Sequence, residues 1–104
     1  MNEHTSLTPR TRRVVQSIFL MEQWTSVEIT LVEDCGPTQI HSPLIDGREL
    51  ERIRLAALKV SKGNLDRLEA AILVAQDDWR DLLVGAGFGN DALAHLCWAD
   101  RWVE

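Results

Sequence analysis

Apolar residues recur at helical spacing in separate segments of the chain, and start and stop signals mark the ends of these segments. Thr8 and Pro9 favour a helix start, so we predict a helix over residues 9–23. The same spacing predicts two further helices, over residues 47–61 and 64–75. A lysine–glycine pair separates these last two helices.

The C-terminal part continues this pattern with a glycine-rich interruption. A short helix is expected over residues 77–83, started by one of two adjacent aspartates. The glycine-rich segment 85–89 ends it, and an asparagine is expected to cap a last helix over residues 90–102.

Residues 26–35 carry two conflicting signals. The alternation of residues 27–31 is typical of a strand, which could belong to a small β-hairpin over residues 26–41. A capping-box motif at residues 25–28 and a glycine–proline helix stop favour a helix instead. We predict a helix, with the hairpin as the alternative.

Together these elements predict an all-α fold, a compact bundle of about five to six short helices. The 104 residues suffice for a single helical domain, 1–104, with one hydrophobic core. Residues 1–7 are expected to be disordered. The predicted core consists of Leu50, Ile53, Ala57, Leu65, Leu68, Ile72, Leu82, Leu83 and Phe88.

The composition is that of a folded globular protein, with 45% hydrophobic and 26% charged residues. This excludes a disordered tail, a fibrous repeat and a disulfide-built miniprotein. The formal net charge of -5 disfavours nucleic acid as a partner, because phosphate neutralisation needs a basic surface. The two cysteines indicate free thiols, and no apolar run is long enough for a bilayer. We therefore expect a cytoplasmic protein without a membrane partner.

Four potential metal ligands, Cys35, His41, His95 and Cys97, match no recognised zinc pattern. His95 and Cys97 are two positions apart on a predicted helix, so their side chains point in nearly opposite directions. Cys35 as a nucleophile with His41 as its base lacks any motif that would orient the pair. We therefore expect no bound metal and no cofactor.

Two further candidates for a functional site, a cluster of aspartates and a glycine-rich segment, have structural explanations. Asp77, Asp78 and Asp81 lie where a helix macrodipole favours negative charge. The segment 85–89 follows a helix rather than a strand and lacks the residues of a phosphate-binding loop, so it is expected to be an interhelical turn. Since no catalytic signature remains, we expect that the protein is not an enzyme, and no small-molecule substrate is evident.

The predicted helix over residues 47–61 carries a basic stripe opposite its apolar face, with a leucine in the middle. In an acidic protein this stripe is a candidate interaction surface. The alternative is a solvated helix face whose leucine is covered by lysine and arginine stems. The stripe consists of Arg48, Arg52, Lys59 and Lys62, around Leu55.

The last predicted helix has apolar residues on two faces. We assign the aliphatic side to the core, which leaves the tryptophan side for a second contact, and tryptophan is enriched at interface hot spots. The alternative is that the N-terminal helix covers the tryptophans within the chain. The aliphatic side consists of Leu93, Leu96 and Cys97, and the tryptophan side of His95, Trp98 and Trp102.

Several segments resemble a group of small uncharacterised bacterial proteins. The similarity covers residues 50–59, 78–88 and 95–98, and it extends back through residues 31–36. The most distinctive shared segment has the sequence DWRDLLV-x-AGF. The resemblance implies a helix rather than a strand for residues 26–35. It implies no activity and no site residues.

The preferred interpretation is a small cytoplasmic, non-enzymatic protein-interaction or regulatory protein of unknown pathway, which binds a protein partner or forms a homodimer. The rival hypothesis is a DNA-associated regulator, because the segment 82–102 resembles a helix-turn-helix whose second helix would contact DNA. That second helix carries more acidic than basic residues, which disfavours contact with phosphates.

Overall fold

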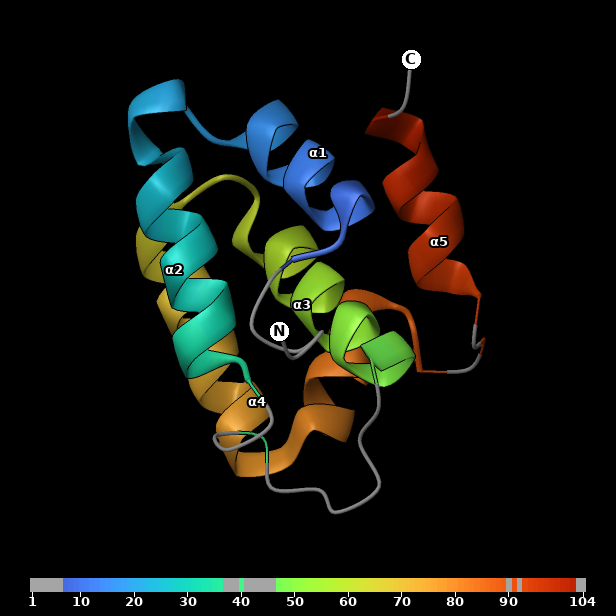
Figure 1. Cartoon of the computed structure of the whole chain (residues 1–104). Coiled ribbons are helices and arrows are strands. Elements are labelled where there is room, and N and C mark those ends of the chain that lie inside the picture. The colour runs from blue at the N-terminus through green and yellow to red at the C-terminus, as the bar shows by residue number, and fades with distance from the viewer. Residues whose placement is uncertain (1–6, 37–39, 41–46, 90, 92, 103–104) are drawn as a thin grey trace.

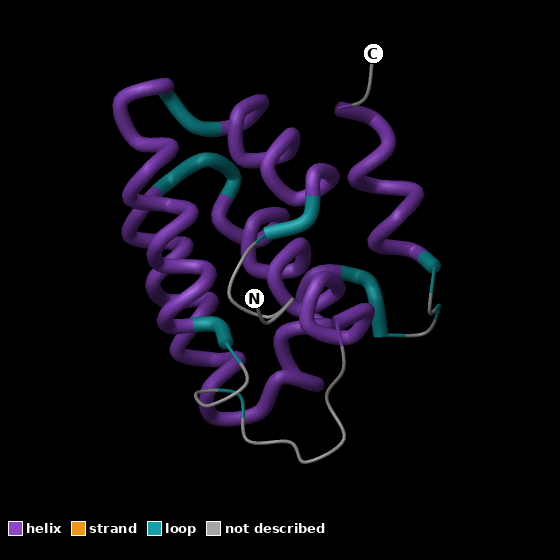
Figure 2. Tube along the Cα trace, in the orientation of Figure 1, coloured by secondary structure: helices purple, strands orange, loops and turns teal. Residues whose placement is uncertain are grey.

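The computed structural model describes residues 7–36, 40, 47–89, 91 and 93–102. These residues form an all-α fold of five α-helices and two short 3-10 helices, and no strand occurs among them (Figures 1 and 2). None of these helices combines the length and the apolar character needed to cross a membrane. The elements are α1 (Pro9–Ile18), η2 (Met21–Gln23), α2 (Trp24–Asp34), α3 (Gly47–Ser61), α4 (Leu65–Ala86), α5 (Ala94–Ala99) and η3 (Asp100–Trp102).

The predicted all-α bundle is confirmed, and the helix prediction for residues 26–35 is correct up to the end of α2. Val27 and Leu31, one helical turn apart, are both fully buried, whereas Ile29 between them is 50% exposed. A strand would have placed all three on one face. The hairpin alternative is therefore wrong for this segment, and most of its second half lies outside the described residues.

Side-chain caps determine where α1 and α4 begin, as the sequence predicts. The Thr8 hydroxyl accepts a hydrogen bond from the backbone N–H of Thr11 (3.1 Å), and the Asn64 side chain accepts one from the N–H three residues later (3.0 Å). Leu7, predicted to be disordered, is instead buried in the core beside the first cap. Residues 1–6 and the predicted cap at Asn90 lie outside the described residues.

The helix predicted over residues 9–23 ends early, at Ile18. Phe19 is extended (φ -110°, ψ 156°) and buries its ring in the core, which turns the chain. The indole N–H of Trp24 donates to the Phe19 carbonyl (3.0 Å) and holds the corner between α1 and α2. As a result α2 begins at Trp24, ahead of the capping box predicted at residues 25–28. Periodicity did not reveal this break, because Phe19 also fits the apolar stripe of a longer helix.

α4 combines the two helices predicted over residues 64–75 and 77–83. Asp78 has a non-helical conformation (φ -152°, ψ 102°) at the kink between its two halves. The Asp78 carboxylate accepts a hydrogen bond from the backbone N–H of Arg80 (3.0 Å), so it caps the second half. This carboxylate has the structural role that the sequence predicts for it.

The glycine-rich segment 85–89 ends α4 and turns the chain towards α5, as predicted. Gly87 adopts the left-handed conformation (φ 82°), and the N–H of Phe88 bonds back to the carbonyl of Leu83 (2.8 Å). These are the features of a glycine C-cap. The turn places the Phe88 side chain in the core.

α3 is the central helix of the bundle. It packs against α1, α4 and α5, and Figure 1 shows it between them. Its residues 53–58 are all buried, so no side of its middle turns is open to solvent. The predicted core residues are all buried except Leu65, which is half-buried at the margin of the core.

Candidate functional site

The last helix packs with the face opposite to the predicted one. On α5, His95 is buried and Trp98 is half-buried against the core. On the predicted aliphatic side, Leu93, just before α5, is 61% exposed, Cys97 is exposed and Leu96 is half-buried. Phe88 explains this orientation, because its ring centre lies 6.2 Å from the ring centres of both His95 and Trp98. Such distances allow favourable aromatic packing. The assignment of the aliphatic side to the core is therefore wrong.

The observed packing weakens the case for a tryptophan interface. Trp98 already contacts Phe88 within the chain, and both α5 and η3 pack against α1. α1 therefore lies against the C-terminal helices, while the aromatic partner of Trp98 is Phe88. The side chain of Trp102 lies outside the described part of the structure.

The predicted basic stripe on α3 is divided between the core and the surface. Leu55, its centre, is fully buried, because α3 is surrounded by other helices. Arg52 is also turned inward, and its guanidinium donates to the carbonyl of Phe88 and to the carboxylate of Glu49 (3.2 Å). Arg48 is exposed at the start of α3. The stripe is therefore not a continuous surface.

An open groove of about 790 Å³ lies between the C-terminal end of α3 and both halves of α4. Its lining includes the buried side chains of Ala71, Leu82 and Ala86 and the exposed side chains of Val74 (43%) and Val84 (70%). The volume falls within the range of about 300–1,000 Å³ that is common for ligand sites. This groove is a concave and largely apolar surface formed by described residues.

Two residues of the predicted stripe, Lys59 and Lys62, line this groove together with Arg67. The Lys59 ammonium lies 5.0 Å from the centre of the Phe88 ring, a cation–π contact that positions it. Within the described part of the chain, none of the three cations takes part in an ion pair. Asp81 is the one carboxylate in the described lining. The groove therefore combines an apolar lining with a basic edge, on a chain whose net charge is -5.

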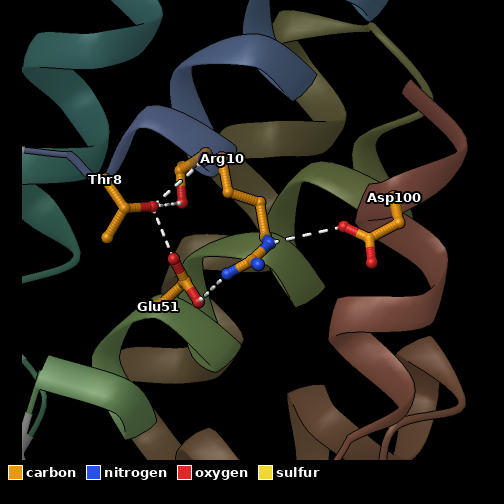
Figure 3. Close-up of polar contacts among 5 residues, drawn as sticks. Thr8, Arg10, Glu51 and Asp100 are labelled. Carbon is orange, nitrogen blue, oxygen red and sulfur yellow. Dashed lines mark hydrogen bonds and ion pairs between the residues drawn. The ribbon is translucent and has the colours of Figure 1, made fainter. Parts of the chain in front are cut away.

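A polar cluster joins the start of α1 to α3 and η3, as Figure 3 shows. The Thr8 hydroxyl donates to one carboxylate oxygen of Glu51, and Arg10 approaches the other at 3.4 Å. Arg10 also lies 3.5 Å from the Asp100 carboxylate. Glu51 is buried, and each of its two carboxylate oxygens has a polar partner. The cluster has a structural role, because it holds the start of α1 against α3 and η3.

His95 lies buried near this cluster, and its Nδ1 has no hydrogen-bond partner among the described residues. Burial lowers the pKa of His95, and the negative charge of Glu51 opposes this effect only in part. The folded chain therefore keeps this imidazole neutral at a pH where the unfolded chain protonates it.

We expect the free energy of unfolding to decrease as the pH falls below about 6.5, the usual pKa of histidine. Below that value the unfolded state binds a proton that the folded state excludes, so one such group contributes a slope of at most about 1.4 kcal/mol per pH unit. Urea unfolding from pH 7 to about 5.5 measures this slope, above the range in which most carboxylates titrate. His95→Gln is the control and should be less sensitive to pH. Equal slopes for the two proteins would contradict this assignment.

The candidate nucleophile and metal ligands do not form a reactive site among the described residues. Burial raises the pKa of the Cys35 thiol to about 12, against the opposing effect of Arg54, so the thiol stays protonated near neutral pH. On α5, His95 is buried while Cys97 is exposed, so the two do not share a face. No group of three or more potential ligands converges in the described part of the chain, and His41 lies outside it.

Comparison with known proteins gives no relatives: the chain matches no model of a protein family, no curated protein and no solved structure. A candidate function therefore has to be argued from the groove itself. The sequence contained one signal for the groove. Residues 70–75 are small and apolar, and cations at positions 59, 62 and 67 precede them. The kink in α4 that shapes the groove could not be located from this run.

Proposed function

We propose that the protein is a non-enzymatic, cytoplasmic interaction protein that binds a partner protein through the groove between α3 and α4. The observation that carries this proposal is the open apolar groove with an unpaired basic edge. Exposed apolar surface rimmed by polar residues is typical of protein-binding sites. Compared with the sequence-based hypothesis, the proposal keeps Lys59 and Lys62 and moves the contact away from Trp98.

The chemistry and shape of the groove favour a protein partner over a substrate. Its described lining has one carboxylate, Asp81, and no histidine, cysteine, serine or threonine, so it offers no hydroxyl or thiol nucleophile and no imidazole base. Small-molecule sites usually enclose most of their ligand. This groove is open along its length, so it suits an occupant that keeps one side in solvent. The alternative of DNA reading by the segment 82–102 gains no support, since two exposed carboxylates, Asp91 and Asp100, outnumber the exposed cation Arg101 after the glycine-rich turn.

The proposal predicts that Gly85→Trp abolishes partner capture whereas Gly85→Ala does not. A Cβ added at Gly85 meets no atom within 4 Å, so a side chain fits there and projects into the groove. Both replacements remove a glycine from a helix, and the alanine should raise the free energy of unfolding by about 0.5–1 kcal/mol. The two variants therefore differ in bulk within the groove rather than in folding.

The measurement is affinity capture from a nuclease-treated native lysate, with sedimentation to detect a second copy of the chain as the partner. Proteins retained by wild type and Gly85→Ala but lost with Gly85→Trp support the proposal. Identical capture by both variants contradicts it. Capture that disappears on nuclease treatment favours the nucleic-acid alternative instead.

A further inference from the structure

We propose that the groove binds an amphipathic helix of its partner, whose apolar side enters the groove and whose acidic side chains meet the basic edge. This inference rests on the proposed function and adds the chemistry of the partner. Three observations support it: the spacing of the lining residues on α4, the helical walls of the groove, and the charges at its edge.

The first half of α4 presents an unfilled helix-packing seam to the groove. Arg67, Ala70, Ala71 and Val74 line the groove at positions i, i+3, i+4 and i+7, the spacing by which one helix packs on another. Ala70 and Val74 on this seam are exposed. Gly85 extends the small-residue surface onto the second half of α4. Small side chains allow the axis of a second helix to come close.

The groove suits a helix better than an extended peptide. An extended segment gains most of its affinity from backbone hydrogen bonds to an exposed strand edge. The walls here are α3 and α4, and a helix has no strand edge to which an extended peptide could bond. A helix brings its own backbone hydrogen bonds and buries only side chains, as in other helix-in-groove complexes.

The charges at the edge favour an acidic partner. Lys59, Lys62 and Arg67 face a single carboxylate, Asp81, and the three cations have no ion-pair partner among the described residues. Lys59 and Lys62 lie at the C-terminal end of α3, where the helix dipole favours positive charge. A carboxylate on the partner would gain from this edge, whereas a cation would be repelled. The rest of this acidic chain carries a net negative charge, so it would attract a cationic partner and repel an acidic one.

The test uses two synthetic amphipathic helices that carry the same leucine stripe. One has glutamates beside the stripe and the other has lysines at the same positions. We expect the glutamate peptide to bind at least about ten-fold more tightly, by calorimetry, and to shift the NMR amide signals of the groove residues. Raising the salt to about 1 M, where the screening length falls to about 3 Å, should remove most of this preference.

Arg67→Glu tests the edge directly. Arg67 is exposed in the first turn of α4, where an acidic residue is favoured by the helix dipole, so the variant should fold. It should weaken binding of the glutamate peptide about three- to ten-fold and strengthen binding of the lysine peptide. Arg13→Glu, at an exposed cation on α1 outside the groove, makes the same change in net charge and should alter neither affinity.

The possible outcomes separate this inference from the proposed function. Equal affinity for both peptides, no binding of either peptide, or binding with shifts outside the groove overturns the inference. If Gly85→Trp still abolishes partner capture in that case, the groove remains the binding site and only the chemistry assigned to the partner is wrong. If Gly85→Trp also leaves capture unchanged, the proposed function fails as well.

Discussion

Phe88→Ala is expected to lower the free energy of unfolding by about 3–5 kcal/mol, the usual cost of removing a large aromatic side chain from a core. Phe88 is 1% exposed and contacts residues of two helices. Its ring packs against His95 and Trp98 of α5 and lies under the Lys59 ammonium of α3. A domain of this size has a total stability of about 5–15 kcal/mol, so the variant should be close to unfolding.

Urea unfolding followed by far-UV circular dichroism and by tryptophan fluorescence measures this loss. Leu93→Ala is the matched control on the same side of the fold. Leu93 is 61% exposed, so its truncation should change the free energy of unfolding by about 0.5 kcal/mol or less. The opposite ranking, with Leu93→Ala the more damaging, would restore the aliphatic face of α5 to the core and contradict the observed packing.

Gly63→Ala is expected to lower the free energy of unfolding by about 2–4 kcal/mol. Gly63 lies in the turn between α3 and α4 with φ 78°, a conformation that disfavours any residue with a side chain. A Cβ at this position would lie 2.4 Å from the backbone carbonyl oxygen of Ile18. Because this atom belongs to the end of α1, the substitution has to push α1 and the turn apart.

Gly87→Ala separates the cost of the left-handed backbone conformation from the cost of the close contact with α1. Gly87 has a similar backbone conformation (φ 82°), but a Cβ there would lie 3.5 Å from the end of the flexible Lys59 side chain, an ordinary contact. It should lose only about 1–2 kcal/mol, from the backbone alone. Unfolding of both variants under the same conditions gives the comparison. Equal losses would show that the approach of α1 to Gly63 does not matter for stability.

The candidate site was only partly predictable from the sequence. The cations Lys59 and Lys62 were identified, because charge and helical spacing are local properties. Leu55 was placed with them on the surface, because its neighbours on the helix are basic. In the structure it is fully buried, since other helices surround the middle of α3. A helical wheel gives the relative directions of side chains but not the number of faces that are covered.

The sequence by itself determined that the chain is helical, where several helices begin and end, and part of the core. These features depend on contacts within a few residues, such as the caps at Thr8, Asn64 and Asp78, and on apolar spacing along one helix. Only the tertiary structure decided which face of α5 packs inward and where the groove lies. Both depend on contacts between residues distant in sequence, and a two-sided apolar pattern fits either orientation until Phe88 is placed against it.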